Sequence, residues 1–528
     1  MKRRSFPPQP SVEHLTTLFR RIDAGDIVVP AFQRAFVWGA GEMLSLMESV
    51  NEGYPIGSLL LWSAEEEILK ISTSQDIPFP HLAAEMPVNY ILDGLQRLST
   101  LYGAFHYEDG VHHRAFDIHY DLTYDRFIRG SDARDLTYET VPMSSLFKPK
   151  RMLEIQRKLI EGGAFEAELD NLTALQSRFQ EYMIPIVTLS QREVDEVVTI
   201  FERVNSTGTR LSRVDFMRAV TWSREFDLNE AIDEVKVSLE GEGFEIDDDT
   251  IVKAMGQKFD LDPVPDSLLK LRIQDARELR QTIPEIVSDF RRVFEFLRSE
   301  LGIFSSEFVP YEGQLLALLK AFSEFGDFDA RDREFLSSWF LRLSFEEALQ
   351  GRPDHHVANL VKNLIRQLRD GGKTVRSLTI DENTFIRRRM LKGKSLTSAI
   401  CVMMAKSEPL DLISGERINS FAITSAYDSN RFVPIFEVGE IERFSGSSVS
   451  AKIPANVVLS TFPFSIREQL NIRSTILGMA EHEGGREILS SHFIFGEMLE
   501  ALRLNDPETF LFLRADAMLD TARQLVSS

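Results

Sequence analysis

Residues 88–100 read VNYILDGLQRLST and hold the junction on which the fold assignment rests. An apolar run over residues 88–92 is typical of a buried strand, and it stops at Asp93 and Gly94. Leucine then recurs at helical spacing over residues 95–107, so a helix is predicted to start directly after the strand. Glycine allows a ligand to approach the backbone closely, and a helix N-terminus offers free N–H groups to an anion. The junction is therefore a candidate anion site.

Short elements of both kinds surround this junction and predict a mixed α/β region. Ser11 can cap a helix that runs to residue 23, because a serine oxygen accepts hydrogen bonds from first-turn N–H groups. A further helix is expected at 41–50, and strands are expected at 27–29, 57–62, 116–120 and 183–189.

The composition limits the classes of protein to which the chain can belong. Its 528 residues include one cysteine, Cys401, which excludes an internal disulfide framework and multi-cysteine zinc modules. A net charge of −21 argues against general polyanion binding, so contacts with nucleic acid are expected only from local patches. No apolar stretch approaches the ~20 residues that a membrane helix needs. We expect a cytoplasmic protein with no membrane partner.

An acidic segment divides the chain. Residues 225–249 hold eleven Asp or Glu and one Lys, a pattern typical of a solvated boundary. Amphipathic spacing then predicts helices over most of 250–415. The expected fold class is α+β, with a mostly helical middle region and domains at 1–224, 225–425 and 426–528.

Three other signals carry less weight. Residues 371–374, GGKT, lack the first glycine of a phosphate loop, because that position is Gln367. The histidine pairs at 112–113 and 355–356 are adjacent in sequence, so their side chains diverge. Basic side chains over residues 387–394 fit either phosphate contact or a solvated helix start.

Two further segments place polar side chains at the ends of predicted elements. Residues 30–38, PAFQRAFVW, hold Gln33 and Arg34 directly after a short strand. Arginine suits phosphate contact, and glutamine can bind a base or a sugar. Residues 201–211, FERVNSTGTRL, form a polar turn between two predicted helices. Taken singly, each segment also fits an ordinary structural role.

Four motifs occur together in one order: P-x-F-Q-R-x-F-V-W at 30–38, Y-P-I-G-S-L-L-L-W at 54–62, D-G-x-Q-R-L-S-T-L at 93–101 and F-x-R-V-N-S-T-G-x-x-L at 201–211. With them, residues 10–220 resemble the ParB-like N-terminal domain of GmrSD-type restriction enzymes. The resemblance implies a ParB/sulfiredoxin-like fold that binds and hydrolyses a nucleoside triphosphate with Mg²⁺ or Mn²⁺.

The resemblance also implies roles for individual residues. Asp93, Gln96 and Arg97 would be catalytic, and Asp93 would bind the metal ion. The family signature is Asp-Gly-Gln-Gln-Arg, and Leu95 replaces its first glutamine in this chain. Hydrolysis is expected to be slower if that glutamine places the attacking water. The nucleotide-binding positions would be Gln33, Arg34, Gly94, Asn205 and Gly208.

The C-terminal region resembles the scaffold of the family's HNH nuclease domain, on residues 412–418, 435–441 and 453–459. Gly439 and Glu440 stand where active members have histidines, while Asn456 is retained. These three residues mark a degenerate nuclease site. Without an imidazole to accept a proton from water near neutral pH, we expect no DNA cleavage by this domain alone.

The leading interpretation is a prokaryotic restriction or anti-phage defence protein that binds and hydrolyses a nucleoside triphosphate and couples this to DNA recognition. The alternative is a non-catalytic protein that responds to nucleotide or DNA and acts with a partner nuclease or as a homo-oligomer. Asp93 and Arg97 favour the enzyme, whereas Leu95 and the missing histidines favour the alternative. A helical interaction scaffold is a third interpretation, but it leaves the four motifs unexplained.

Overall fold

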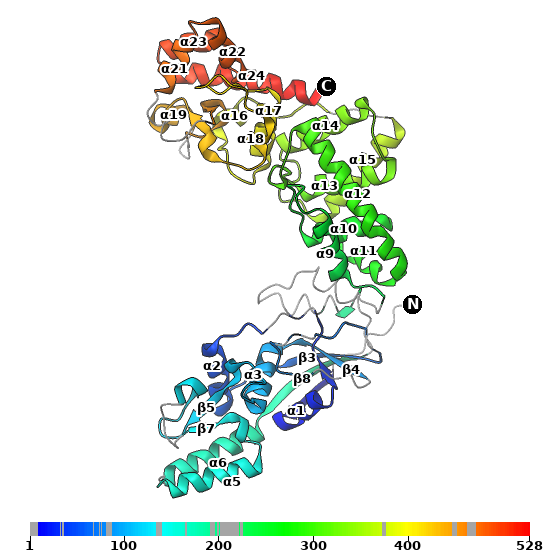
Figure 1. The fold of residues 1–528 in the computed structure, drawn as a ribbon, viewed down its shortest axis with the longest axis vertical. Coiled ribbons are helices and arrows are strands. Elements are labelled where there is room, and N and C mark those ends of the chain that lie inside the picture. The colour runs from blue at the N-terminus through cyan, green and yellow to red at the C-terminus, as the bar shows by residue number, and fades with distance from the viewer. Residues whose placement is uncertain are drawn as a thin grey trace. The chain divides into compact units, whose positions relative to one another are not determined.

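The computed structural model describes most of the chain, and the chain divides into two compact units, Met1–Leu228 and Asn229–Ser528 (Figure 1). The expected further division at residue 425 stays a prediction. The described residues are 9–31, 33, 36–66, 68–72, 74, 76–80, 87–133, 140–163, 166–190, 196–197, 200, 221, 225–371, 376–445, 451–461 and 471–527.

A five-stranded mixed sheet forms the centre of the first unit. Its strand order is β1-β8-β3-β4-β2, with antiparallel pairing of β1 with β8 and of β3 with β4, and parallel pairing of β8 with β3 and of β4 with β2. The predicted mixture of helices and strands is therefore present. The strands are β1 (Gln9–His14), β2 (Ile27–Val28), β3 (Leu59–Ala64), β4 (Val88–Asp93) and β8 (Met183–Ser190).

The start of the chain departs from the sequence-based expectation. The predicted helix from Ser11 was wrong over its first turn, because Gln9–His14 is an edge strand and the helix begins only at Leu15. Ser11 pairs with Ile186 of β8. Pairing with a strand more than 170 residues away satisfies the backbone here, and a local capping pattern does not report such a partner.

Helices and a second, smaller sheet complete the first unit (Figure 1). Side chains from both form one apolar core with the central sheet. The helices are α1 (Leu15–Asp23), α2 (Ala40–Asn51), α3 (Leu95–His106), α4 (Gly130–Ala133), α5 (Pro149–Glu161) and α6 (Glu166–Glu181). The smaller sheet has the order β6-β5-β7, from β5 (Ile118–Asp121), β6 (Arg126–Arg129) and β7 (Thr140–Pro142).

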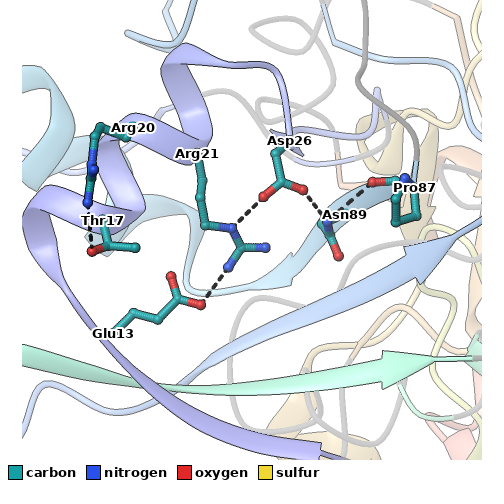
Figure 2. Close-up of polar contacts among 7 residues, drawn as sticks. All are labelled: Glu13, Thr17, Arg20, Arg21, Asp26, Pro87 and Asn89. Carbon is teal, nitrogen blue, oxygen red and sulfur yellow. Dashed lines mark hydrogen bonds and ion pairs between the residues drawn. The ribbon is translucent and has the colours of Figure 1, made fainter.

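A polar network connects α1 with the two opposite edges of the central sheet (Figure 2). The Arg21 guanidinium donates to Glu13 of β1 at 2.8 Å and to Asp26, just before β2, at 2.5 Å. Asn89 at the start of β4 donates to the same Asp26 carboxylate. Arg21 and its two carboxylates are each about a quarter exposed, so the pairs are partly shielded from water.

The second unit is mainly helical, as the amphipathic spacing predicts. Helix α12 (Ala276–Leu301) has a cap residue at each end. Asp275 accepts hydrogen bonds from Arg277 N and Glu278 N, and the C-cap residue is Gly302 with φ 63°. The acidic stretch at 225–249 includes helix α9 (Leu228–Ser238), which buries Leu228, Ile232 and Val235. No described helix is long and apolar enough to cross a membrane. The helices from α9 on are α9 (Leu228–Ser238), α10 (Asp248–Lys258), α11 (Pro265–Leu268), α12 (Ala276–Leu301), α13 (Glu312–Phe325), α14 (Ala330–Phe345), α15 (Asp354–Asp370), α16 (Asn383–Arg387), α17 (Ser395–Lys406), α18 (Ser420–Thr424), α19 (Val438–Ser445), α21 (Ile472–Met479), α22 (Glu483–Ser491), α23 (Gly496–Arg503) and α24 (Pro507–Ser527).

Two short antiparallel strands lie near the end of the second unit. Strand β9 (Phe432–Pro434) pairs with β10 (Val457–Leu459). Helix α24 packs against the turn that leads into β10 and against α14, α16 and α23. This pairing places the C-terminal motif segments at 435–441 and 453–459 next to each other.

Candidate functional site

The candidate site lies where β4 ends and α3 begins. Asp93 is the last residue of β4, and Gly94 is the cap residue of α3 with φ 94° and ψ 9°. A Cβ atom at Gly94 would lie 2.4 Å from Leu59 Cδ2, so both the backbone conformation and the space require glycine. The pairing of β3 with β4 also shifts register between Leu60 and Leu61, and such a bulge redirects nearby side chains.

Arg97 in the first turn of α3 joins two of the sequence motifs. Its Nη1 donates to the Ile56 carbonyl oxygen at 2.7 Å, and its Nη2 donates to Asp93 Oδ2 at 3.0 Å. Gly57, at φ 86°, lies directly beneath the guanidinium, since a Cβ there would be 2.5 Å from Nη1. The Y-P-I-G segment is therefore held against the Asp93 end of β4 by one arginine.

Two glutamines attach the motif at residues 30–38 to the same end of β4. Gln96 Oε1 accepts hydrogen bonds from Val37 N at 3.0 Å and from Trp38 N at 3.3 Å. Gln33 Nε2 donates to the carbonyl oxygens of Ile91, at 3.1 Å, and Leu92, at 2.8 Å. Both amides therefore fix the residues 30–38 segment against the end of β4.

The structure thus brings together Gln33, Asp93, Gln96 and Arg97, which are four of the residues expected at the site. Arg34, Asn205 and Gly208 lie outside the described residues. The roles of all these side chains stay predictions. Sequence reasoning did not place Ile56 and Gly57 at the site, although their Y-P-I-G motif was a usable signal.

Leu95 does not face the polar side of this junction. Its side chain is 4% exposed and belongs to the apolar core of the unit. A glutamine at this helix position would point into the same core if the backbone were unchanged. The replacement by Leu95 therefore affects the apolar core and not the polar side of the junction.

The charged side chains of Asp93 and Arg97 differ in their exposure to solvent and in the hydrogen-bonding groups that they still offer to a ligand. The Asp93 side chain is 37% exposed, and the Arg97 side chain is 19% exposed. A guanidinium has five N–H donors, so Arg97 retains donors beyond its two described contacts. The Asp93 carboxylate and the Arg97 guanidinium are the charged groups through which this junction can bind metal ion and phosphate.

Two of the three residues expected at the degenerate nuclease site, Asn456 and Glu440, make contacts that stabilise the local structure. Asn456 is fully buried, accepts a hydrogen bond from Phe436 N at 3.0 Å, and donates to the carbonyl oxygens of Phe436 and Ala451. Glu440 caps its own helix at Glu437 N and pairs with Arg473 at 2.9 Å. Gly439 lies in α19 with open space around it. Within the described residues, no group of three metal-binding side chains is present.

His492 and Arg514 fill the space beside β10. His492 bonds to the carbonyl oxygen of Leu410 through Nε2 at 2.7 Å and accepts from Leu459 N through Nδ1. Burial lowers the pKa of His492 to about 4, so the ring is neutral near pH 7. Arg514 is fully buried and donates to the carbonyl oxygens of His492, Ala455 and Val457. Both ring nitrogens of His492 are engaged with main chain, so this histidine is not free to act as a base.

Comparison with known proteins agrees with the motif arrangement of the first unit. The model of the GmrSD restriction endonuclease N-terminal domain matches residues 15–222. An uncharacterized protein of Methanocaldococcus jannaschii, MJ0686, is 22% identical over 600 aligned positions, which cover 98% of this chain and 99% of the relative. The relative therefore spans both units. Residues 15–222, which lie within the first unit, are therefore similar to the N-terminal domain of GmrSD restriction endonucleases.

Proposed function

We propose that the N-terminal unit binds and hydrolyses a nucleoside triphosphate at the end of β4, and that the chain acts in restriction or in defence against phage DNA. One observation carries the proposal: hydrogen bonds bring residues of three separate motifs together where β4 joins α3. The match to a restriction endonuclease domain supports the biological setting. A ParB-like arrangement of this unit and an HNH-like origin of the C-terminal region belong to the same proposal.

The donor set fits a metal ion that arrives with the nucleotide. Mg²⁺ in nucleotide sites usually takes one or two carboxylates together with substrate phosphates and water. Asp93 offers one such carboxylate, and no metal-binding cluster of three side chains occurs within the described ranges. The metal ion, when bound, would neutralise phosphate charge during transfer to water.

Arg97 is suited to hold phosphate without releasing the Y-P-I-G segment. Its Nη1 contact with Ile56 leaves other N–H groups that can turn from Asp93 toward an anion. Charge-assisted hydrogen bonds of this type are stronger than neutral ones. Gln96 would position nucleotide or water only if a ligand shifted its contacts with Val37 and Trp38.

A second function is favoured by those same internal contacts. Gln33, Gln96 and Arg97 all bind main-chain atoms of neighbouring segments. A ligand that engages these side chains would change how tightly the segments are held, as expected for a nucleotide-responsive binding protein. In that case a partner nuclease would perform the cleavage.

The test is calorimetric titration of the purified chain with each of the four nucleoside triphosphates and Mg²⁺, combined with a phosphate-release assay with and without duplex DNA. Binding with turnover supports the hydrolase, whereas binding without turnover supports the responsive protein. Asp93→Asn is expected to abolish turnover. Asp170→Asn, at an exposed aspartate of α6, is the matched control and is expected to leave it unchanged. Failure of all four nucleotides to bind would exclude both functions.

A further inference from the structure

The segment from the last residue of α16 to the start of α17 concentrates positive charge on an acidic unit. Residues 229–528 contain 48 acidic and 36 basic side chains. Against this trend, residues 387–394, RRRMLKGK, carry five basic side chains within eight positions. All five are exposed: Arg387, Arg388, Arg389, Lys392 and Lys394.

The backbone that carries these side chains is anchored to the unit. Phe385 and Ile386 are completely buried, and Met390 is 3% exposed. Met390 N donates to the Lys452 carbonyl oxygen at 3.0 Å, and Leu391 N donates to Thr397 Oγ1 at 2.9 Å. The basic side chains therefore project from a fixed frame, which lowers the entropy lost when they bind a ligand.

Few of these charges are neutralised within the protein. Arg388 pairs with Glu347 at 3.4 Å and Lys392 pairs with Glu307 at 2.8 Å, but the two cations remain 65% and 71% exposed. Exposed ion pairs are weak and exchange readily with other anions. Arg387, Arg389 and Lys394 have no carboxylate partner among the residues that the structure describes.

The charges also stand at the less favourable end of a helix. Lys394 is the N-cap of α17, a 12-residue helix, and makes no side-chain capping bond. A helix N-terminus carries partial positive charge, so a cation there is unfavourable and an anion is favourable. Neighbouring like charges on the segment add to this cost. A bound polyanion would offset both unfavourable effects: the cation at the helix N-terminus and the repulsion between neighbouring like charges.

From these observations we propose that residues 387–394 and the start of α17 bind the phosphate backbone of duplex DNA. Several separate cations suit a row of phosphates better than one small anion. The segment contains no Asn or Gln, the side chains that read adenine in the major groove, so it should position DNA without reading sequence. This site lies in the second unit and needs no nucleotide, so it goes beyond the proposed triphosphate function.

The experiment measures duplex DNA binding by fluorescence anisotropy at several salt concentrations, with the full chain and without nucleotide. The variant is Arg387→Ala/Arg389→Ala/Lys394→Ala. Each phosphate contact contributes about −0.9 to the slope of log K against log salt concentration. The magnitude of this slope should therefore be about 3 smaller for the triple variant than for the parent chain. The affinity loss between 50 and 200 mM salt should accordingly be about 40-fold smaller than in the parent chain.

A matched triple variant removes the same charge elsewhere on the unit. Lys270, Arg331 and Arg352 are exposed and lie outside the segment, and their replacement by Ala should leave the slope within about 1 of the parent. Arg387→Lys/Arg389→Lys retains the charge and should retain the slope even if an alanine variant folds poorly. Equal slopes for the parent and the first triple variant would overturn the proposal. Tighter charge-dependent binding to anionic phosphatidylserine vesicles than to DNA would also overturn it.

Discussion

Arg97 Nη2 lies 3.0 Å from Asp93 Oδ2, four residues earlier in the chain, and the same guanidinium holds the Ile56 carbonyl oxygen at 2.7 Å. The two charged side chains at the end of β4 therefore neutralise each other. A metal ion on Asp93 or a phosphate on Arg97, as proposed above, would compete with this pair. The Nη1 contact with the Ile56 carbonyl oxygen is separate from the pair and would keep the Y-P-I-G segment in place.

Arg97→Ala is expected to weaken triphosphate binding by about 1.5–3 kcal/mol, the scale of a charge-assisted hydrogen bond. Loss of the Ile56 contact should also lower the free energy of unfolding by about 1 kcal/mol. Calorimetry measures the first effect and denaturant unfolding the second. The control is Arg157→Ala, which removes another i,i+4 pair, with Glu161 at 3.1 Å on an exposed helix face. Unchanged affinity for every nucleotide would remove Arg97 from the site.

The space beneath Arg97 yields a second prediction. Gly57→Ala would place a Cβ 2.5 Å from Arg97 Nη1 at a backbone φ of 86°. Gly53 has a similar φ of 71° but open space around it, so Gly53→Ala isolates the backbone strain, about 1–3 kcal/mol. Gly57→Ala should cost about 1 kcal/mol more, because the guanidinium must leave the Ile56 oxygen.

Denaturant unfolding of both alanine variants, alone and combined with Arg97→Ala, measures this difference. The extra cost of Gly57→Ala should disappear when residue 97 is alanine, since no guanidinium then occupies the space. Equal costs in the two backgrounds would mean that Gly57 is needed only for its backbone conformation.

The junction at Asp93 was predictable from sequence because its signal is local. An apolar run, a glycine and a leucine repeat lie within 14 consecutive residues, 88–101, and β4 and α3 occur where these patterns place them. The Ile56–Arg97 contact was not predictable in this way. It joins residues 41 positions apart, and only the pairing of β3 with β4 brings them together.

The same reason explains the error at Ser11 and the limits of the C-terminal prediction. A serine followed by a helical pattern looks like a cap, but the distant strand β8 takes this segment into the sheet. Asn456 was predicted as a remnant of a nuclease site from motif order. The motif carries no information about its three main-chain hydrogen bonds.

His492 gives the second unit a defined dependence on pH. Burial lowers the pKa of His492 from 6.5 to about 4, so the unfolded chain binds a proton at a higher pH than the folded chain does. Stability is therefore fully present above pH 6.5 and falls as the pH drops toward 4, by roughly 3 kcal/mol for this group. Burial raises the pKa of Asp411, but hydrogen bonds from Thr461, Ile413 and Ser414 outweigh it and lower the pKa below its ordinary value. Asp411 therefore contributes to the pH dependence at more acidic pH.

The measurement is the free energy of unfolding at intervals from pH 7 to pH 4. His492→Gln should be less stable at pH 7 and should lose this pH dependence. His482→Gln changes an exposed histidine of the same region and serves as control. A parent-like pH profile in the His492→Gln variant would show that another group titrates in this window.

The last prediction separates a structural role from a catalytic one in the C-terminal region. Asn456→Ala leaves the main-chain groups of Phe436 and Ala451 without their partner in a fully buried place. A loss of about 2–4 kcal/mol is expected, with faster amide hydrogen exchange in β9 and β10. Glu440→Ala breaks a partly exposed pair with Arg473 and a capping hydrogen bond from Glu437 N, and it should cost about 1–2 kcal/mol.

Because Asn456→Ala perturbs the fold, Glu440→Ala is the informative variant for nuclease activity. With Mg²⁺ or Mn²⁺ and each nucleoside triphosphate, we expect the purified chain to leave modified and unmodified phage DNA intact. His492 is neutral and bonded to main chain on both nitrogens, and Glu440 is engaged with Arg473 and Glu437 N. Cleavage that disappears in Glu440→Ala but survives Asp93→Asn would contradict this expectation. It would place an active nuclease at α19, independent of the triphosphate site at the end of β4.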